Sequence, residues 1–186
     1  MRDIASEAET NVASIAYHYG SKEGLRIACA EAVAGQMREV AGQVILTGDA
    51  GGDPAEALAI MEKAMSALAA FIVARPEAAD IAAFMTREMT DPGPALERIY
   101  EELIGPVHTA LCRLWATATG GDPDSAATRL AVFAMAGQIV YFRIGRPVVL
   151  KRMGWSEIGP DEAEQIVATV TGNLRAMVAA GKADAT

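Results

Sequence analysis

The side chains that most often carry catalysis or bind metals are few and scattered in this sequence. His18 and His108 lie far apart, and neither has a nucleophile in a recognisable motif. The glycine pair at 51–52 lies in an acidic linker without the lysine that follows a phosphate-binding glycine loop. Cys29 and Cys112 have no metal-ligand spacing, and we interpret both as small core residues. The sequence therefore predicts no enzyme active site, cofactor site or metal site.

Residues 2–15 have the pattern of a helix-turn-helix, in which two short helices cross closely. Ala5 supplies the small residue that such a crossing needs midway along the first helix. The apolar residues expected to hold the two helices together are Ile4, Ala8, Val12 and Ile15. In this motif the second helix lies in the major groove of DNA, with its N-terminal residues at the base edges.

The charge of the chain gives this interpretation no support. The formal net charge is -8, whereas DNA-binding domains are usually basic. Residues 1–26 contain three cationic and four acidic side chains. The prediction of DNA binding therefore rests on the motif alone.

The composition favours a helical protein. Hydrophobic residues make up 52% of the chain, much of it alanine, and aromatic residues only 5%. Mean hydropathy is +0.20. We find no apolar run of the roughly 18 residues that a membrane span needs, and no signal peptide. The expected location is the cytoplasm, with no membrane partner.

Apolar residues recur with a period near 3.6, which predicts an all-α fold. We expect a short helix over 2–8, a second over 11–18 and a long third helix over 22–46, started by Ser21 after a break at Gly20. The buried stripe expected on the long helix comprises Leu25, Cys29, Ala32, Gln36, Val40 and Val44. Further helices are expected at about 54–75, 76–89, 96–119, 124–144 and 161–180. This organisation indicates a small front domain over 1–46 and a larger helical bundle over 47–186.

Two features of the later helices stand out. Pro106 lies inside a helix, where it must remove one backbone donor, so we expect a kink and a free carbonyl at Glu102. The segment after Pro147, which contains Trp155, is expected to be a connector to the last helix.

The segment IAYHYGSKEGL at 15–25 resembles the signature of the TetR family, in which an aromatic-rich helix end is followed by a Gly-Ser-Lys-Glu junction. The resemblance implies a DNA-binding repressor with an all-α, TetR-like fold. It implies groove-facing roles for Asn11, Val12, Ser14, Tyr17 and His18. It also implies phosphate contacts by Arg2 and Lys22. For His18 the alternative is an ordinary surface side chain.

The front segment departs from the family pattern at three positions and at its start. Glu9 and Thr10 stand where the family usually has glycine and valine, and Ala16 replaces a usual tyrosine. A left-handed turn at Glu9 costs about 1 kcal/mol or more. The pattern begins at the second helix of the family's three-helix domain, so we expect the first helix to be missing. Such a front domain is expected to be loosely held and to bind DNA weakly.

The rest of the chain resembles a narrower branch of the same family. The segments FMTREMTDP at 84–92 and GQIVYFRIGRP at 137–147 are similar to the C-terminal domain of the CecR group of TetR-like regulators. We expect residues 47–186 to form the ligand-binding and dimerisation domain.

We expect the inducer to be a mostly apolar molecule bound beside the Pro106 kink, because methionine-rich pockets adapt to varied ligands. The candidate ligand-binding residues are Met61, Met65, Phe84, Met89, His108, Trp115, Tyr141 and Arg143. The alternative is that the apolar members are ordinary core and that His108 is structural. Arg87 and Arg143 either pair with a carboxylate such as Glu88 or Glu101 or bind an anionic ligand.

The helix over 124–144 is apolar around most of its circumference, more than one core can cover. We therefore expect a homodimer through this helix and the helix over 161–180, near Ile166, Val170 and Leu174. A twofold dimer predicts a palindromic DNA operator, released when the inducer tilts the long helix. The alternatives are an enzyme or carrier that uses the same cavity, and a helical interaction module without DNA binding.

Overall fold

The structure is a computed structural model that describes residues 1–184, and every regular element in that part of the chain is a helix. The all-α prediction is confirmed. In chain order, with η marking π-helical turns, the elements are α1 (Arg2–Glu7), α2 (Val12–Tyr19), α3 (Lys22–Met37), η1 (Arg38–Gly42), α4 (Gln43–Thr47), α5 (Pro54–Ala74), α6 (Ala78–Thr90), α7 (Pro94–Ile99), η2 (Tyr100–Ile104), α8 (Gly105–Thr119), α9 (Ala126–Ile144), α10 (Arg146–Met153) and α11 (Pro160–Asp184).

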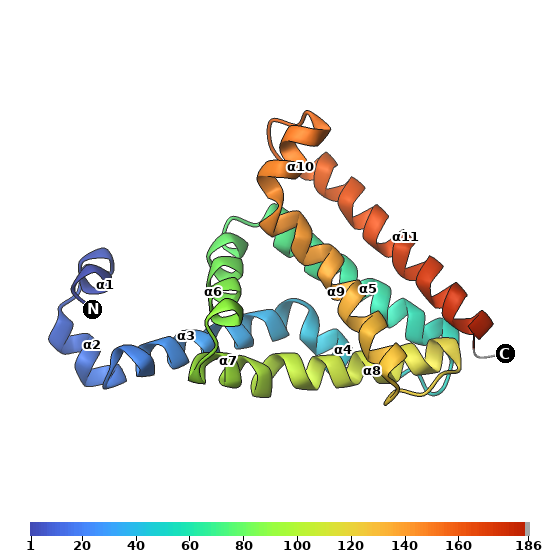
Figure 1. The fold of residues 1–186 in the computed structure, drawn as a ribbon, viewed down its shortest axis with the longest axis horizontal. Coiled ribbons are helices and arrows are strands. Elements are labelled where there is room, and N and C mark those ends of the chain that lie inside the picture. Colours follow the sequence, from blue (N-terminus) through green and yellow to red (C-terminus); the bar gives the residue numbers. More distant parts are fainter. Residues whose placement is uncertain (185–186) are drawn as a thin grey trace.

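Two long rods form the base of the molecule. One is the continuous run α3–η1–α4 and the other is α7–η2–α8, and they lie side by side (Figure 1). Helix α5 packs against α8, α9 and α11, so it forms the centre of the bundle. Helix α6 connects the far end of α5 to the start of α7, and α10 lies at the apex between α9 and α11 (Figure 1). Helices α1 and α2 lie at the outer end of the first rod.

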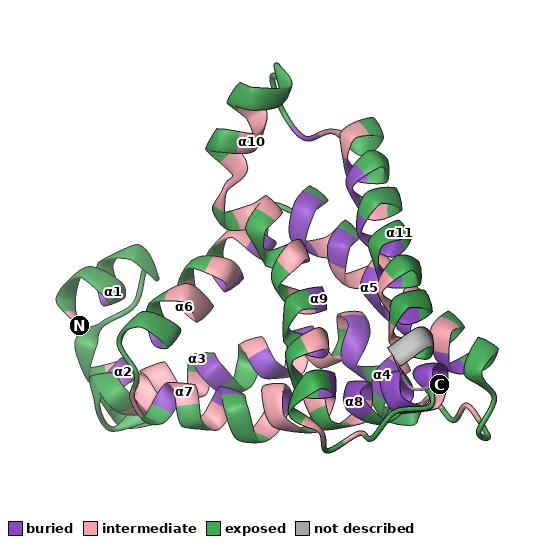
Figure 2. Cartoon of the chain, turned by 45° about the vertical axis from the view of Figure 1, so that its right-hand side comes forward, coloured by how far each residue is buried: buried purple, intermediate pink, exposed green. Residues whose placement is uncertain are grey.

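The core is centred on α5, α8 and the inner faces of α9 and α11 (Figure 2). The predicted stripe on the long helix is wrong by about one residue in phase. The residues actually buried there are Ala30, Ala34, Met37, Ala41 and Ile45. Alanine side chains form most of this contact because α3 packs closely along α7, whereas Cys29 and Gln36 are exposed. The prediction that Cys29 is a core residue is therefore wrong, and the same prediction for Cys112 is confirmed.

At the position of the predicted kink, the structure has a π-helical segment, η2, directly before Gly105. Proline has no N–H to donate to the carbonyl of Glu102, four residues earlier. Arg38 of η1 donates to that oxygen instead, with Nη1 at 2.9 Å. The two π-helical segments are thus bonded to each other, one on each rod.

Two other predictions are corrected. The expected connector after Pro147 is helical up to Met153, because it continues the helix α10, in which Pro147 suits the first turn. Helix α5 is the one helix in the described part of the chain that is long and apolar enough to cross a membrane, contrary to our expectation of none. Its 21 residues include Met61, Met65 and Val73, all buried among neighbouring helices, as expected of a core helix.

Candidate DNA-reading surface and ligand cavities

Helices α1 and α2 form the predicted pair, with Ala5 and Ile15 buried at their crossing. The apolar seam is only partly formed, because Ile4 and Val12 each remain 39% exposed and Ala8 is exposed too. Helix α2 makes most of its contacts with the start of α3. Its orientation is therefore set by the long helix that carries it.

The turn between α1 and α2 has the backbone that we predicted. Glu9 has a φ of 48°, and it is the only non-glycine residue of the described chain with a positive φ. Its side chain is exposed. The turn is closed by the N–H of Thr10, which donates to the carbonyl of Ala5 at 2.9 Å. A carboxylate therefore lies on the loop just before α2.

Helix α2 starts at a side-chain cap. The Oδ1 atom of Asn11 accepts a hydrogen bond from the N–H of Ser14 at 2.7 Å. The amide nitrogen of Asn11 makes no such bond and is exposed, so it stays available as a donor. Ser14 is half-buried, whereas Val12 is exposed. The cap gives Asn11 a structural role that the groove-facing prediction did not include.

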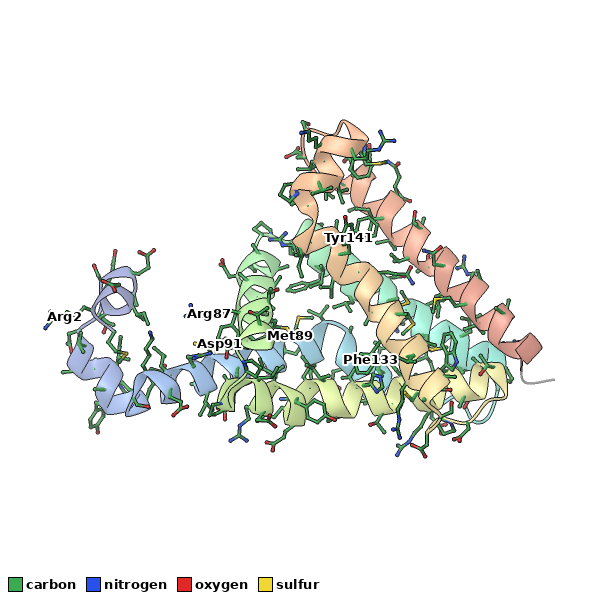
Figure 3. The ribbon with its side chains drawn as sticks, in the orientation of Figure 1. Arg2, Arg87, Met89, Asp91, Phe133 and Tyr141 are labelled. Atoms are coloured by element: carbon green, nitrogen blue, oxygen red, sulfur yellow. The ribbon has the colours of Figure 1, made fainter. Side chains whose placement is uncertain are left out.

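Aromatic side chains project from the C-terminal end of α2. Tyr17 is 86% exposed, the largest value among the large apolar side chains described. Its ring meets that of His18 edge to face, with 5.2 Å between the ring centres. Arg2 and Lys22 are both exposed, and neither forms an ion pair in the described structure. Figure 3 shows Arg2 at the outer tip of the molecule.

The junction to α3 explains the glycine-rich part of the motif. Gly20 ends α2 with a φ of 71°, and the hydroxyl of Ser21 caps α3 by accepting from the N–H of Gly24 at 3.0 Å. A Cβ at Gly24 would collide with the carbonyl oxygen of Tyr19. The turn therefore needs glycine at both positions, and it fixes the angle between α2 and α3.

An ion pair that the sequence did not reveal connects α3 to α6. Arg26 binds Glu88 through two hydrogen bonds, Nε to Oε1 at 3.2 Å and Nη2 to Oε2 at 2.6 Å. The Glu88 side chain is only 1% exposed. The hydrogen bond to Glu88 and its charge raise the pKa of Arg26 above the usual value. The expectation that Glu88 pairs with Arg87 or Arg143 is wrong, and neither arginine forms an ion pair within residues 1–184.

The eight candidate ligand-binding residues do not form one site. Met61, Met65 and Trp115 are buried in the core, and Phe84 packs against its edge. Met89 is 51% exposed near the lower end of α6, whereas Tyr141 lies far from it on α9 (Figure 3).

The other candidates line separate hollows. Tyr141 lines a groove between α9, α10 and α11, and Arg143 lines a hollow between α6 and α9. Partial burial lowers the pKa of Arg143, and the neighbouring charge of Arg146 lowers it further. His108 lines a cavity between α8 and α9, directly beside the π-helical segment η2. Of the predicted residues, His108 is therefore the one that lines a cavity beside η2 and Pro106.

The family model of the C-terminal domain of the HTH-type transcriptional dual regulator CecR matches residues 57–181, from α5 to α11. The chain belongs to the CecR family. The resemblance to this branch of TetR-type regulators is thereby confirmed.

Two curated relatives show how far the similarity extends. The chain is 33% identical over 175 residues to the HTH-type transcriptional dual regulator CecR of Shigella flexneri, covering 91% of this chain and 78% of that protein. It is 26% identical over 147 residues to the HTH-type transcriptional regulatory protein RaaS of Mycobacterium tuberculosis, covering 77% of this chain and 62% of that protein. The first alignment is too long to be confined to the C-terminal domain.

The CecR-type domain of this chain leaves one face of α9 uncovered. The large apolar side chains exposed on this helix are Leu130, Phe133, Val140, Tyr141 and Ile144. Leu130, Tyr141 and Ile144 lie on the side opposite the buried residues Val132 and Ile139. More than half of the surface of each of these three side chains is exposed, so this side of α9 is largely open to solvent.

Proposed function

We propose that this chain is a DNA-binding transcriptional repressor that acts in the cytoplasm as a homodimer on a palindromic operator and is released by a small molecule. The observation that carries the proposal is the exposure of α2. Tyr17 and His18 are exposed to water at the outer end of the molecule, so they contribute little to its core and are available to a partner. Both HTH-type relatives regulate transcription, which supports the same reading.

The chemistry of the side chains on this surface indicates which of them contact bases and which contact phosphates. Asn11, Tyr17 and His18 carry donors and acceptors that suit base edges. Lys22, at the start of α3, and Arg2 are free cations placed to bind phosphate. Because the chain as a whole is acidic, these two cations supply much of the salt-dependent part of the affinity.

The homodimer is proposed through α9 and α11. Helix α9 contributes its uncovered apolar side, and a Cβ at Gly137 would meet nothing within 4 Å, so another helix can approach closely there. Helix α11 offers similar open space at Gly172. We expected Ile166, Val170 and Leu174 in the dimer interface. They cannot contribute to it, since these side chains are buried within the same subunit. The α11 surface in the proposed interface is therefore built from small and polar residues.

Release from DNA by a ligand requires that ligand binding in the bundle displace α3. The Arg26–Glu88 pair supplies a direct connection, because Glu88 is buried in α6 and Arg26 lies in the second turn of α3. A displacement of α6 must either carry Arg26 along or leave a buried carboxylate without its cation, which is unfavourable. A ligand that binds the state with α6 displaced more tightly, by about 1–3 kcal/mol, measurably shifts the positions of the two α2 helices.

The test is the effect of Tyr17→Ala with His18→Ala on binding to the DNA upstream of the chain's own gene, measured by fluorescence anisotropy. Loss of both side chains is expected to weaken binding at least about tenfold. Melting temperature and dimerisation should be unchanged, since both side chains are exposed.

Two results would contradict the proposal. A double variant that unfolds would show that these residues are core. Wild-type chain that binds none of this DNA in a salt-dependent manner would favour an interaction module or a ligand carrier instead.

A further inference from the structure

The cavity beside η2 has the composition of a ligand site. Its volume is about 410 Å³, within the range of about 300–1,000 Å³ typical of small-molecule sites. Aromatic walls come from Tyr100, His108 and Phe133, and two arginines, Arg113 and Arg129, lie at its border. Cations and aromatic side chains therefore converge here, on a chain whose overall charge is negative.

The aromatic wall is held in a fixed orientation. The rings of His108 and Phe133 stack at a tilt of 31°, with 4.1 Å between their centres. Both ring nitrogens of His108 have neighbours, since Nε2 lies 3.3 Å from the carbonyl oxygen of Arg129 and Nδ1 lies 3.6 Å from Sγ of Cys112. Burial raises the pKa of the Cys112 thiol, so its S–H can donate to Nδ1 while Nε2–H donates to the carbonyl.

The charges that face the cavity favour an anion. Arg129 is engaged by Asp124, with Nη2 at 3.4 Å from Oδ1. The guanidinium of Arg113 is exposed and forms no hydrogen bond or ion pair within the described chain. Its planar set of donors matches a carboxylate in a bidentate arrangement. A ligand with both a flat ring and an acidic group would complement this unpaired guanidinium and the aromatic wall beside it.

We propose that this cavity binds a planar aromatic carboxylate, with its ring beside His108 and Phe133 and its carboxylate on Arg113. This ligand class refines the mostly apolar inducer expected from the sequence and names a class for the small molecule of the proposed function. Binding itself does not depend on that function.

The position of the cavity gives such a ligand access to the long helix. Tyr100 and Ile104 belong to η2, and η2 also contains Glu102, whose carbonyl accepts from Arg38 of η1. Single π-helical turns within α-helices are often found at functional sites. A ligand against η2 therefore touches the segment that is bonded to the rod carrying α2.

Calorimetric titration of the full chain tests the site, with 1-naphthoate and its uncharged analogue 1-naphthamide as probes. Wild type is expected to bind naphthoate at least about tenfold more tightly than naphthamide. Arg113→Gln should abolish this preference by weakening naphthoate alone. Thr109→Phe, which fills the cavity from its exposed rim, should abolish binding of both probes. Lys151→Gln removes an exposed cation elsewhere and should bind both as wild type does.

The proposal is overturned if wild type binds no naphthoate, or if the preference for naphthoate survives Arg113→Gln. The two proposals fail separately. A chain that binds naphthoate but no DNA contradicts the repressor function and leaves the site intact, whereas a chain that binds DNA but no naphthoate does the reverse.

Discussion

Glu9 is expected to lower both the stability of the front segment and its affinity for DNA. Its φ of 48° is a conformation that costs a side chain with a Cβ about 1 kcal/mol. Its carboxylate lies on the turn that precedes α2, where DNA phosphates would approach. Strain and charge are separable at this position by substitution.

Glu9→Gly is expected to raise the free energy of unfolding by about 0.5–1 kcal/mol, because glycine adopts positive φ freely. Glu9→Gln keeps the strain and should leave the stability unchanged. Both variants remove the negative charge, so both should bind DNA more tightly than wild type. Urea unfolding and fluorescence anisotropy measure the two effects, and equal stability of the two variants would show that the turn is not strained.

Residues with local roles were predictable from the sequence, whereas residues with distant partners were not. Gly20 and Ser21 were correctly predicted because breaking and capping depend on immediate neighbours. The pairing of Arg26 with Glu88 joins residues 62 positions apart, and no local pattern distinguishes it from other possible pairs. Arg113 was missed as a candidate site residue for the same reason, because Phe133, which completes the aromatic wall beside it, is contributed by α9.

At the scale of elements, the two rods are joined through their π-helical segments. Arg38→Met removes the donor to the Glu102 carbonyl and is expected to lower the free energy of unfolding by about 1 kcal/mol. Pro106→Ala restores the N–H that proline lacks. In that background Arg38→Met should cost clearly less, because the carbonyl has a second donor. Urea unfolding of the four proteins gives the coupling, and additive effects would show that Arg38 does not compensate for the proline.

Helix types and most helix ends followed from periodicity, glycine and proline, but the buried faces and the short α10 did not. The buried face of α3 is lined by alanine, which a search for bulky apolar residues passes over. Helix α10 carries exposed Val148 and Met153 and has no buried residue, so it lacks the pattern of an amphipathic helix. An irregularity in the helix at Pro106 was predicted, since it depends on the chemistry of one residue.

At the scale of the whole molecule, the proposed homodimer rests on the uncovered side of α9. Leu130 is 68% exposed there, and Leu130→Glu is expected to shift the protein from a dimer to a monomer of 19.5 kDa in analytical ultracentrifugation. Burying an unpaired carboxylate in an interface is strongly unfavourable. Leu46→Glu changes a leucine that is 43% exposed on α4, outside this surface, and should remain dimeric. A dimeric Leu130→Glu variant would place the interface elsewhere.

The most direct test of the whole account is hydroxyl-radical footprinting of the DNA upstream of the chain's own gene. Two α2 helices presented by a symmetric pair should protect two half-sites whose centres lie about 10 base pairs, or a multiple of one DNA turn, apart. The protection should weaken as salt rises. Protection of a single site, or none at low salt, would contradict the account.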